Sequence, residues 1–236
     1  MAEAEWRVAA DPSPMLESLW GRASDRKMRL FAVACCRRVC EHLIDPKVRN
    51  ALELIERAAD GSDITRKLHR ASEDLGDLME RLERRYGELF RFCDYRWLPT
   101  HAVMCLFDQR DQSGLAAVCN VASVPNLITE FVRGSSLSDY RDQDEFAEKA
   151  AQSHLLRDIF GPLPFCPVAL DPSWLTSTVV ALAQTIYAER AFDRLPILAD
   201  ALEDAGCDNA DILTHCRGDG PHVRGCWVVD LILGKE

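Results

Sequence analysis

The sequence predicts an all-α protein, an irregular multi-helix bundle or helical array of about nine to eleven helices. Three observations support this fold class. Apolar residues recur at steps of three and four along most of the chain, which is the period of a helix face packed on a core. No alternation typical of a strand persists for five residues. The gaps between the last predicted helices are only two to four residues long, so neighbouring helices must pack side by side.

Three helices are predicted in the N-terminal part of the chain. Residues 24–43 carry apolar side chains at helical spacing, with Ser24 as the N-cap. Residues 46–60 form the second helix. Residues 63–92 carry an almost heptad apolar stripe, which predicts a long helix packed along another helix. Glycines such as Gly76 weaken this third helix, and a break there is an alternative.

The chain between residues 93 and 142 is harder to assign. Its short apolar runs are broken by polar and glycine-containing segments, so we predict short helices, with strands as the competing interpretation. A regular helix resumes at residues 144–160. The proline-rich segment 161–167 is the best candidate boundary between an N-terminal helical lobe, residues 1–160, and a C-terminal helical lobe, residues 168–236. One continuous domain is the alternative.

Four helices are predicted in the C-terminal lobe. They span residues 172–190, 193–205, 209–217 and 222–233. Asp171 is the expected N-cap of the first, because a proline follows it at the first helical position. Asp193 is the expected cap of the second, which ends at Gly206. A turn rich in glycine precedes the last helix, which is amphipathic.

Composition and charge limit the classes of function. The 236 residues include 28 Lys and Arg against 38 Asp and Glu, so the formal charge is −10. Such an acidic surface argues against non-specific binding to nucleic acid or to anionic membranes. The N-terminus lacks the basic and apolar regions of a signal peptide, and no apolar run approaches the roughly 20 residues that span a bilayer. We therefore expect a cytoplasmic protein without a membrane partner.

One predicted helix is a local exception to the acidic charge. It carries the basic side chains Arg26, Lys27, Arg29, Arg37 and Arg38. Such a group can meet phosphate or an acidic partner, which leaves nucleic acid open as an alternative. The favoured interpretation is a solvated face, or pairing with acidic helices of the same chain. We therefore expect the partner to be a protein.

Cysteine is unusually frequent, with 10 residues in the chain. In a reducing compartment these are buried apolar side chains, metal ligands or reactive thiols, and a disulfide framework is disfavoured. Cys35, Cys36 and Cys40 lie together in the basic helix, and their roles stay open. A denser group lies near the C-terminus, where Cys207, His215, Cys216, His222 and Cys226 fall within 20 residues.

Four residues of this C-terminal group, Cys207, His215, His222 and Cys226, are the candidate metal ligands. Thiolate and imidazole are the ligands that Zn²⁺ prefers, and a tetrahedral site takes four of them. His222 and Cys226 are four residues apart, so they are expected to share one face of the last helix. A structural zinc ion would then fix the short helix over residues 209–217. The spacing of the ligands matches no common zinc-finger pattern.

Two other interpretations apply to the same residues. Cysteines in the core, with histidines at helix caps or on the surface, are the commoner situation, and the sequence favours it over zinc. The other is a reactive thiol, in which Cys226, His222 and Asp230 lie along one helix face as nucleophile, base and carboxylate. Nucleophile and base usually come from different elements, so this interpretation is the least favoured.

Two parts of the chain resemble a known family. One is ASDRKMRLFAVACCRR at residues 23–38; the other runs from LLRDIFG at residues 155–161 through LPILADALEDAGCDNAD at 195–211 to HVRGCWVVD at 222–230. Together they cover about half of the chain and resemble a large family of uncharacterised paralogous proteins from planctomycete bacteria. The resemblance implies a bacterial cytosolic origin, and it implies no activity, cofactor or catalytic residue.

Two classes of function follow from the sequence. The first is a helical interaction or adaptor protein that binds a protein partner through its helix faces, with a structural zinc ion near the C-terminus as an option. The alternative is a metal- or thiol-dependent enzyme that uses the C-terminal cluster of cysteines and histidines. The phosphate-binding loop, the His-Glu-x-x-His motif and the Gly-x-Ser-x-Gly motif are all missing from the sequence, which favours the first class.

Overall fold

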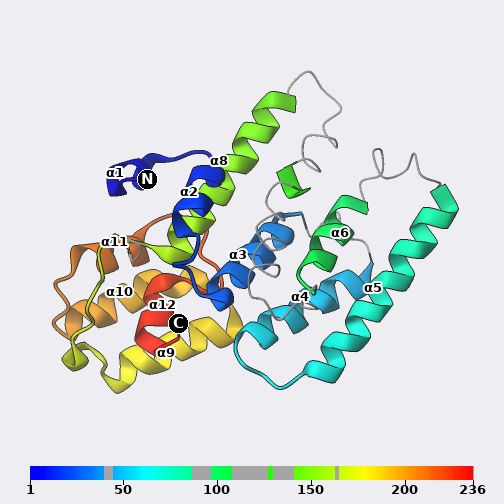
Figure 1. Ribbon diagram of the computed structural model, residues 1–236. Coiled ribbons are helices and arrows are strands. Elements are labelled where there is room, and N and C mark those ends of the chain that lie inside the picture. Colours follow the sequence, from blue (N-terminus) through cyan, green and yellow to red (C-terminus); the bar gives the residue numbers. More distant parts are fainter. Residues whose placement is uncertain (40–44, 87–96, 108–126, 130–140, 163–164, 236) are drawn as a thin grey trace. The chain divides into compact units, whose positions relative to one another are not determined.

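The computed structural model describes residues 1–39, 45–86, 97–107, 127–129, 141–162 and 165–235. All regular secondary structure in these residues is helical, which confirms the predicted all-α array (Figure 1). The α-helices are α1 (Glu3–Val8), α2 (Pro12–Leu19), α3 (Asp25–Arg38), α4 (Pro46–Ala59), α5 (Thr65–Tyr86), α6 (Trp97–Cys105), α8 (Arg141–Phe160), α9 (Ser177–Glu189), α10 (Leu195–Asp204), α11 (Ala210–Arg217) and α12 (Trp227–Leu233). Within the described ranges, no helix is both long and apolar enough to cross a membrane.

The N-terminal helices follow the predicted pattern. α3 begins after Ser24, whose hydroxyl accepts a hydrogen bond from the backbone N–H of Lys27 as an N-cap. α5 passes through Gly76 without a break. α1 and α2 were not predicted, because each is so short that apolar periodicity is hard to recognise. The ends of two predicted helices and most of the segment 93–142 lie outside the described residues.

Two C-terminal helices begin later than predicted. Asp171 caps only a single turn of 3-10 helix, η2 (Pro172–Trp174), through a hydrogen bond from the Ser173 N–H. α9 then starts after Thr176, which is its N-cap. Asp193 lies inside a second 3-10 turn, η3 (Phe192–Arg194), and does not cap α10. Apolar periodicity therefore predicted the presence of α9 and α10 correctly. Asp171 and Asp193, which were predicted as their N-caps, belong instead to the short 3-10 turns that precede these helices.

The last helix is also shorter than predicted. α12 begins at Trp227, so the prediction of a helix over residues 222–233 is wrong for residues 222–226. Gly225 takes a φ of 99°, which lies outside the right-handed helical region. The Cys226 N–H closes a turn on the Val223 carbonyl oxygen at 2.9 Å. This turn, rather than a helix face, carries His222 and Cys226.

The chain forms two compact units. The C-terminal unit contains Met1–Ala9, Ser13–Arg22 and Ser153–Glu236, and the central unit contains Ala10–Pro12 and Ala23–Gln152. The division falls inside α8. The sequence suggested a boundary at residues 161–167 instead, with the whole N-terminus in the other lobe. One reason for the difference is the Arg157 guanidinium on α8, which donates to the backbone carbonyls of Trp6 and Ala9 at 3.1 and 2.9 Å and so ties α1 to the C-terminal unit.

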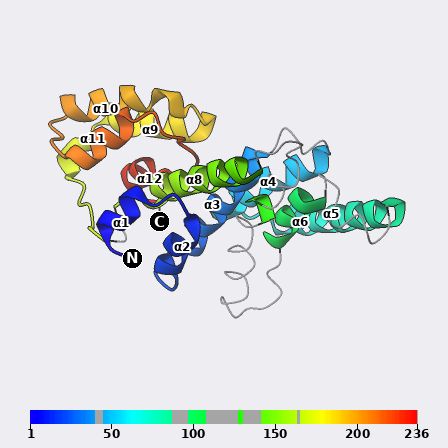
Figure 2. The same ribbon diagram turned by 90° about the horizontal axis from the view of Figure 1, so that it is seen from above.

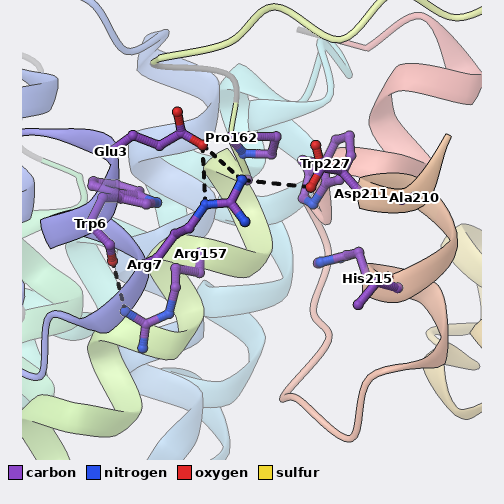
Figure 3. A pocket seen from close by; sticks show the side chains of 11 residues that line it. Glu3, Trp6, Arg7, Arg157, Pro162, Ala210, Asp211, His215 and Trp227 are labelled. Carbon is purple, nitrogen blue, oxygen red and sulfur yellow. Dashed lines mark hydrogen bonds and ion pairs between the residues drawn. The ribbon is translucent and has the colours of Figure 1, made fainter.

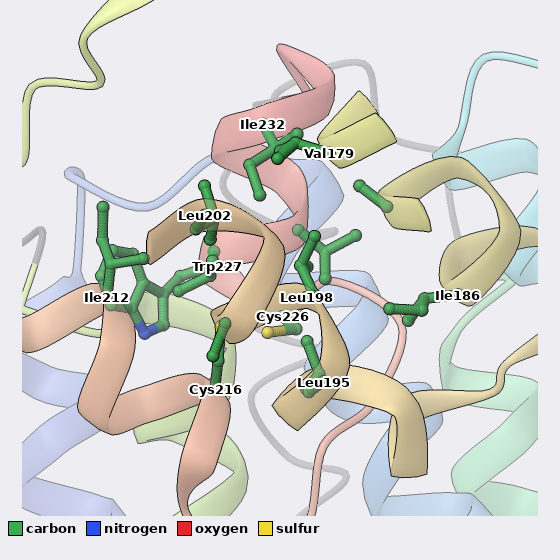
Figure 4. Packing of buried hydrophobic residues seen from close by; sticks show 14 of the residues in the cluster. Val179, Ile186, Leu195, Leu198, Leu202, Ile212, Cys216, Cys226, Trp227 and Ile232 are labelled. Carbon is green, nitrogen blue, oxygen red and sulfur yellow. The ribbon is translucent and has the colours of Figure 1, made fainter. Parts of the chain in front are cut away.

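The core of the C-terminal unit lies between α9, α10, α11 and α12. α10 contacts both α9 and α11, and α12 packs on α9; the two views show these helices as neighbours (Figures 1 and 2). Leucine and isoleucine side chains fill the space between them (Figure 4). Three cysteines, Cys207, Cys216 and Cys226, are buried in the same cluster, together with Trp227. The three C-terminal cysteines therefore lie in a packed hydrophobic core.

In the central unit, α3 packs on α4 and α6, and three of its basic side chains form ion pairs with carboxylates of the same unit. Arg26 contacts Asp60 at 3.1 Å, Arg37 contacts Glu56 at 2.8 Å, and Arg38 contacts Glu148 at 2.9 Å. Pairing within the chain is one of the two interpretations that the sequence favoured for this helix, the other being a solvated face. Cys35 and Cys36 are buried on the same helix, while Cys40 lies outside the described residues.

The ion pair between Glu148 and Arg38 is expected to stabilise the central unit. Glu148 is 4% exposed and accepts hydrogen bonds from the Arg38 guanidinium and from the Gln152 side-chain amide. We expect Glu148→Ala to lower the free energy of unfolding by about 2–3 kcal/mol, because it leaves a partly buried guanidinium without its carboxylate. Chemical denaturation followed by circular dichroism measures this change.

The matched control is Glu80→Ala on α5, where Glu80 makes an exposed ion pair with Arg84 one turn away. Exposed pairs of this kind contribute little, so we expect a change below about 0.5 kcal/mol. Equal effects of the two substitutions would contradict the assignment of a stabilising buried pair at Glu148.

Candidate metal centre

Four side chains of the C-terminal unit converge on one point. They are Asp158 on α8, His215 on α11, and His222 and Cys226 in the segment between α11 and α12. Each offers one ligand atom, and these four atoms all lie within 4.8 Å of one another. Asp158 and Cys226 are buried, and the two histidine side chains are largely buried. The group therefore joins Asp158 on α8 to three residues that lie more than 50 positions later in the sequence and close to one another.

Local structure explains how these elements present their side chains. α11 is capped by Asn209, which accepts from the Ile212 N–H, and His215 lies in its last turn. The chain leaves α11 at Gly218 and turns back, so that His222 and Cys226 face the same side as His215. Asp158 lies in the last turn of α8. A carboxylate there meets the negative end of the helix dipole, which is unfavourable unless positive charge lies nearby.

Two atoms of the group, Asp158 Oδ1 and His215 Nε2, each take part in two contacts. His222 Nδ1 lies 2.7 Å from Asp158 Oδ1, and His215 Nε2 lies 3.2 Å from the same oxygen. The same His215 Nε2 also lies 3.2 Å from the Cys226 sulfur. Around a tetrahedral Zn²⁺ ion, neighbouring ligand atoms are about 3.3–3.6 Å apart, as the Zn–N and Zn–S bond lengths require. The two 3.2 Å contacts come close to this spacing, whereas the 2.7 Å contact is a hydrogen-bond distance and the four ligand atoms lie within 4.8 Å of one another, so a bound metal ion would require small shifts of these side chains.

Hydrogen bonds around the group hold two ligands in the orientation that metal binding needs. The Gly218 carbonyl can only accept, so the 3.2 Å contact to His222 Nε2 places a proton on that nitrogen. His222 Nδ1 then faces the Asp158 carboxylate, and it would release its proton and offer its lone pair when a metal ion binds. The Val223 N–H donates to Asp158 Oδ2 at 2.9 Å and leaves Oδ1 facing the group. Metal-binding histidines and carboxylates are typically fixed by such outer contacts.

The electrostatics of the group favour positive charge beside Asp158, from a histidine proton or from a bound cation. Burial acts to raise the pKa of Asp158, but hydrogen bonds and charge interactions with the two histidines outweigh it and lower the pKa, so the carboxylate is ionised. Burial acts to lower the pKa of His222, and the hydrogen bond to Asp158 reverses this and raises it. Burial and the negative Asp158 raise the pKa of the Cys226 thiol well above its usual range. A cation bound at the centre would lower it again and yield a thiolate ligand.

The arrangement differs from a catalytic triad. In a triad the base uses one ring nitrogen for the nucleophile and the other for the carboxylate. Here a single nitrogen, His215 Nε2, faces both the Cys226 sulfur and the Asp158 carboxylate. Cys226 is also fully buried, and its raised pKa is the opposite of what a nucleophilic thiol needs. The geometry favours a common centre over a reactive thiol.

Three of the four ligands proposed from the sequence are in this group, and one is not. His215, His222 and Cys226 come together, although the last two lie in a turn and not on one helix face. Cys207 is buried in the hydrophobic core, in the turn after α10, and does not belong to the group. Asp158 takes the fourth position. A signal for Asp158 is present in the sequence. It is an aspartate within LLRDIF, where the neighbouring apolar residues are expected to be buried, and aspartate is rarely buried without a partner.

Comparisons of the chain with models of protein families, with curated proteins and with solved structures found no match. The resemblance to a planctomycete family therefore stays a prediction.

Proposed function

We propose that this protein is a helical interaction protein whose C-terminal unit is held together by one structural Zn²⁺ ion. The observation that carries the proposal is the convergence of Asp158, His215, His222 and Cys226 on one point. Under this proposal the metal is a structural part of the fold, and helix surfaces contact a protein partner. A thiolate ligand suits a reducing compartment, so a cytoplasmic location is part of the proposal.

The chemistry of the four ligands supports zinc over other common ions. One sulfur, two imidazole nitrogens and one carboxylate oxygen form a mixed set that suits a borderline-soft ion. Mg²⁺ and Ca²⁺ prefer sets made of oxygen atoms alone. Four protein ligands also complete a tetrahedron, which is typical of structural sites, because catalytic zinc keeps one position for water or substrate.

The elements that the ion would join support a structural role. α11 has 8 residues and α12 has 7, and helices of this length are not stable alone in water. The ligands lie at the end of α8, at the end of α11 and at the start of α12. One ion bound there would connect three chain segments that the sequence separates.

The first test is the metal content of the purified protein. We expect about one zinc ion per chain by elemental mass spectrometry, and below roughly 0.2 per chain in Cys226→Ser and His222→Ala, because each loses one of four ligands. Cys207→Ser is the matched control. It removes another buried cysteine of the same core and should keep the zinc.

Cobalt substitution separates a structural from a catalytic site. The Co²⁺-loaded protein should show intense visible bands of a tetrahedral ion together with a thiolate charge-transfer band that disappears in Cys226→Ser. Added azide should leave the spectrum unchanged if all four positions are held by protein. A spectrum that responds to azide would contradict the structural role and favour the metal-dependent enzyme. A zinc-free protein that also fails to bind added zinc would contradict both.

A further inference from the structure

α1 is attached to the rest of the C-terminal unit by one buried side chain. Trp6 is 2% exposed, whereas the other residues of α1 are half-buried or exposed, and Val8 is 80% exposed. The Trp6 ring packs edge-on against Phe165, with 5.6 Å between the ring centroids. Short helical peptides that bind to a protein surface typically depend on such buried anchors. The unit therefore holds α1 in the way that a protein holds a peptide ligand.

Two arginines supply the remaining contacts that hold α1. Arg157 on α8 donates from Nη1 to the backbone carbonyl oxygens of Trp6 and Ala9, at 3.1 and 2.9 Å. These contacts fix the backbone of the segment without selecting its side chains. Arg7 reaches from α1 toward Asp211 on α11, at 3.7 Å, and both of these side chains are exposed (Figure 3). Trp6 is therefore the main specific contact, and Arg7 adds a charge opposite Asp211.

The contacts that stabilise the helical shape of α1 lie within the segment itself. The Glu5 carboxylate accepts from the Ala2 N–H at 2.8 Å, and Arg7 pairs with Glu3 one turn earlier at 2.7 Å. These contacts stay with the segment when it leaves the unit. A helix of 6 residues is nevertheless too short to be stable alone in water. α1 therefore depends on the surface that it covers.

α1 fills its position poorly. A cavity of about 450 Å³ separates it from the ends of α8, α11 and α12 (Figure 3), and a second cavity of about 620 Å³ lies between α1 and α2. The buried Trp6 indole Nε1–H has no hydrogen-bond acceptor among the described residues. Missing contacts and an unpaired buried donor both lower the stability of the docked state relative to a fully packed one. A segment with a better fit can therefore displace α1.

We propose that α1 is an internal, autoinhibitory ligand and that the surface under it is the docking site for a protein partner. The α1-binding surface includes Arg157, Phe165 and Asp211. The partner inserts a short helical segment with one aromatic anchor and a neighbouring basic residue, because the bound α1 shows this combination. The inference rests on the interaction role proposed above and names its surface, but it uses no metal-binding atom.

The test uses a fluorescein-labelled peptide of residues 1–10, the purified full chain and fluorescence anisotropy. Trp6→Ala removes the anchor, so α1 of this variant should leave its surface. We expect saturable binding of the peptide to Trp6→Ala, at least about tenfold tighter than to the natural chain. The reason is that only three residues, 9–11, join α1 to α2, and so short a tether gives α1 an effective concentration in the millimolar range.

Matched substitutions locate the bound peptide. A peptide that itself carries Trp6→Ala should bind at least about tenfold more weakly, because it lacks the anchor. Adding Arg157→Met to the Trp6→Ala chain should weaken the peptide at least about fivefold, since two charge-assisted contacts to its backbone are lost. Arg217→Met is the control. Arg217 pairs with Asp200 and Glu203 at the surface, and its loss should change the affinity by less than about twofold.

Hydrogen exchange on the natural chain tests the release of α1 without a substitution. The Trp6 backbone N–H is hydrogen-bonded to the Ala2 carbonyl oxygen at 3.0 Å, so its exchange reports on the opening of α1. We expect it to exchange at least about a hundredfold faster than the slowest amides of α9 and α10, because α1 opens while the core stays folded.

Four results would overturn the proposal. The peptide does not bind a folded Trp6→Ala chain, or it binds the natural chain equally well. The Trp6 amide exchanges as slowly as the core, which would mean that α1 leaves only on global unfolding. The natural chain forms a dimer that Trp6→Ala abolishes, which would make a second copy the occupant. Zinc content is measured in each variant, so that a failure of the metal proposal is seen separately.

Discussion

Asp158→Ala is expected to abolish zinc binding and to lower the free energy of unfolding of the C-terminal unit by at least about 4 kcal/mol. The substitution removes the oxygen that both histidines contact and the acceptor of the Val223 N–H. It also leaves two largely buried imidazoles and a buried thiol without a counter-charge. Chemical denaturation with tryptophan fluorescence, together with metal analysis, measures both effects.

The control and the chelator experiment separate a metal centre from a hydrogen-bonded network. Asp200→Ala removes an exposed carboxylate that pairs with Arg217, and we expect a change below about 0.5 kcal/mol. A strong chelator should destabilise the natural protein but leave Asp158→Ala unchanged, because that variant holds no zinc. If the chelator has no effect on the natural protein, the four residues form a hydrogen-bonded network and the account is wrong.

Gly161→Ala is expected to lower the free energy of unfolding by about 2–4 kcal/mol. Gly161 follows α8 with a φ of 55°, which is strained for any residue with a Cβ. The added Cβ would also lie 2.6 Å from the buried indole of Trp227, so the ring must move within a packed core. The thermal midpoint and the denaturant midpoint should both fall.

Gly234→Ala is the matched control for this prediction. Gly234 has a φ of 62°, close to that of Gly161, but a Cβ there would meet nothing within 4 Å. The control thus carries the backbone strain alone, about 1 kcal/mol. If both substitutions lower the stability equally, the close approach of Trp227 to Gly161 contributes nothing to it, which would contradict the tight contact described for this pair.

The periodicity of the sequence predicted the long helices well. α3, α4 and α5 repeat apolar residues over several turns, and such patterns leave little choice of structure. Helix starts were harder to predict. Asp171 and Asp193 have the residue type of an N-cap, but the same side chain also suits a 3-10 turn, and the tertiary structure decided between them.

The candidate site could be predicted only in part, for a physical reason. His215, His222 and Cys226 are near one another in the sequence, so a search for dense groups of ligands finds them. Asp158 comes from a helix that precedes the link to the C-terminal helices, and no local pattern connects it to them. Cys207 is close in sequence, but the turn after α10 directs it into the core. Nearness in the chain is therefore a partial guide to convergence in space.

The most direct test of the four-ligand zinc site is X-ray absorption at the zinc edge, or anomalous diffraction from crystals of the purified protein. We predict one zinc ion bonded to Asp158, His215, His222 and Cys226, with bond lengths of about 2.0–2.3 Å and no bound water. Zinc bound by a set that includes Cys207 in place of Asp158, zinc with a water ligand, or no zinc at all would contradict the central claim.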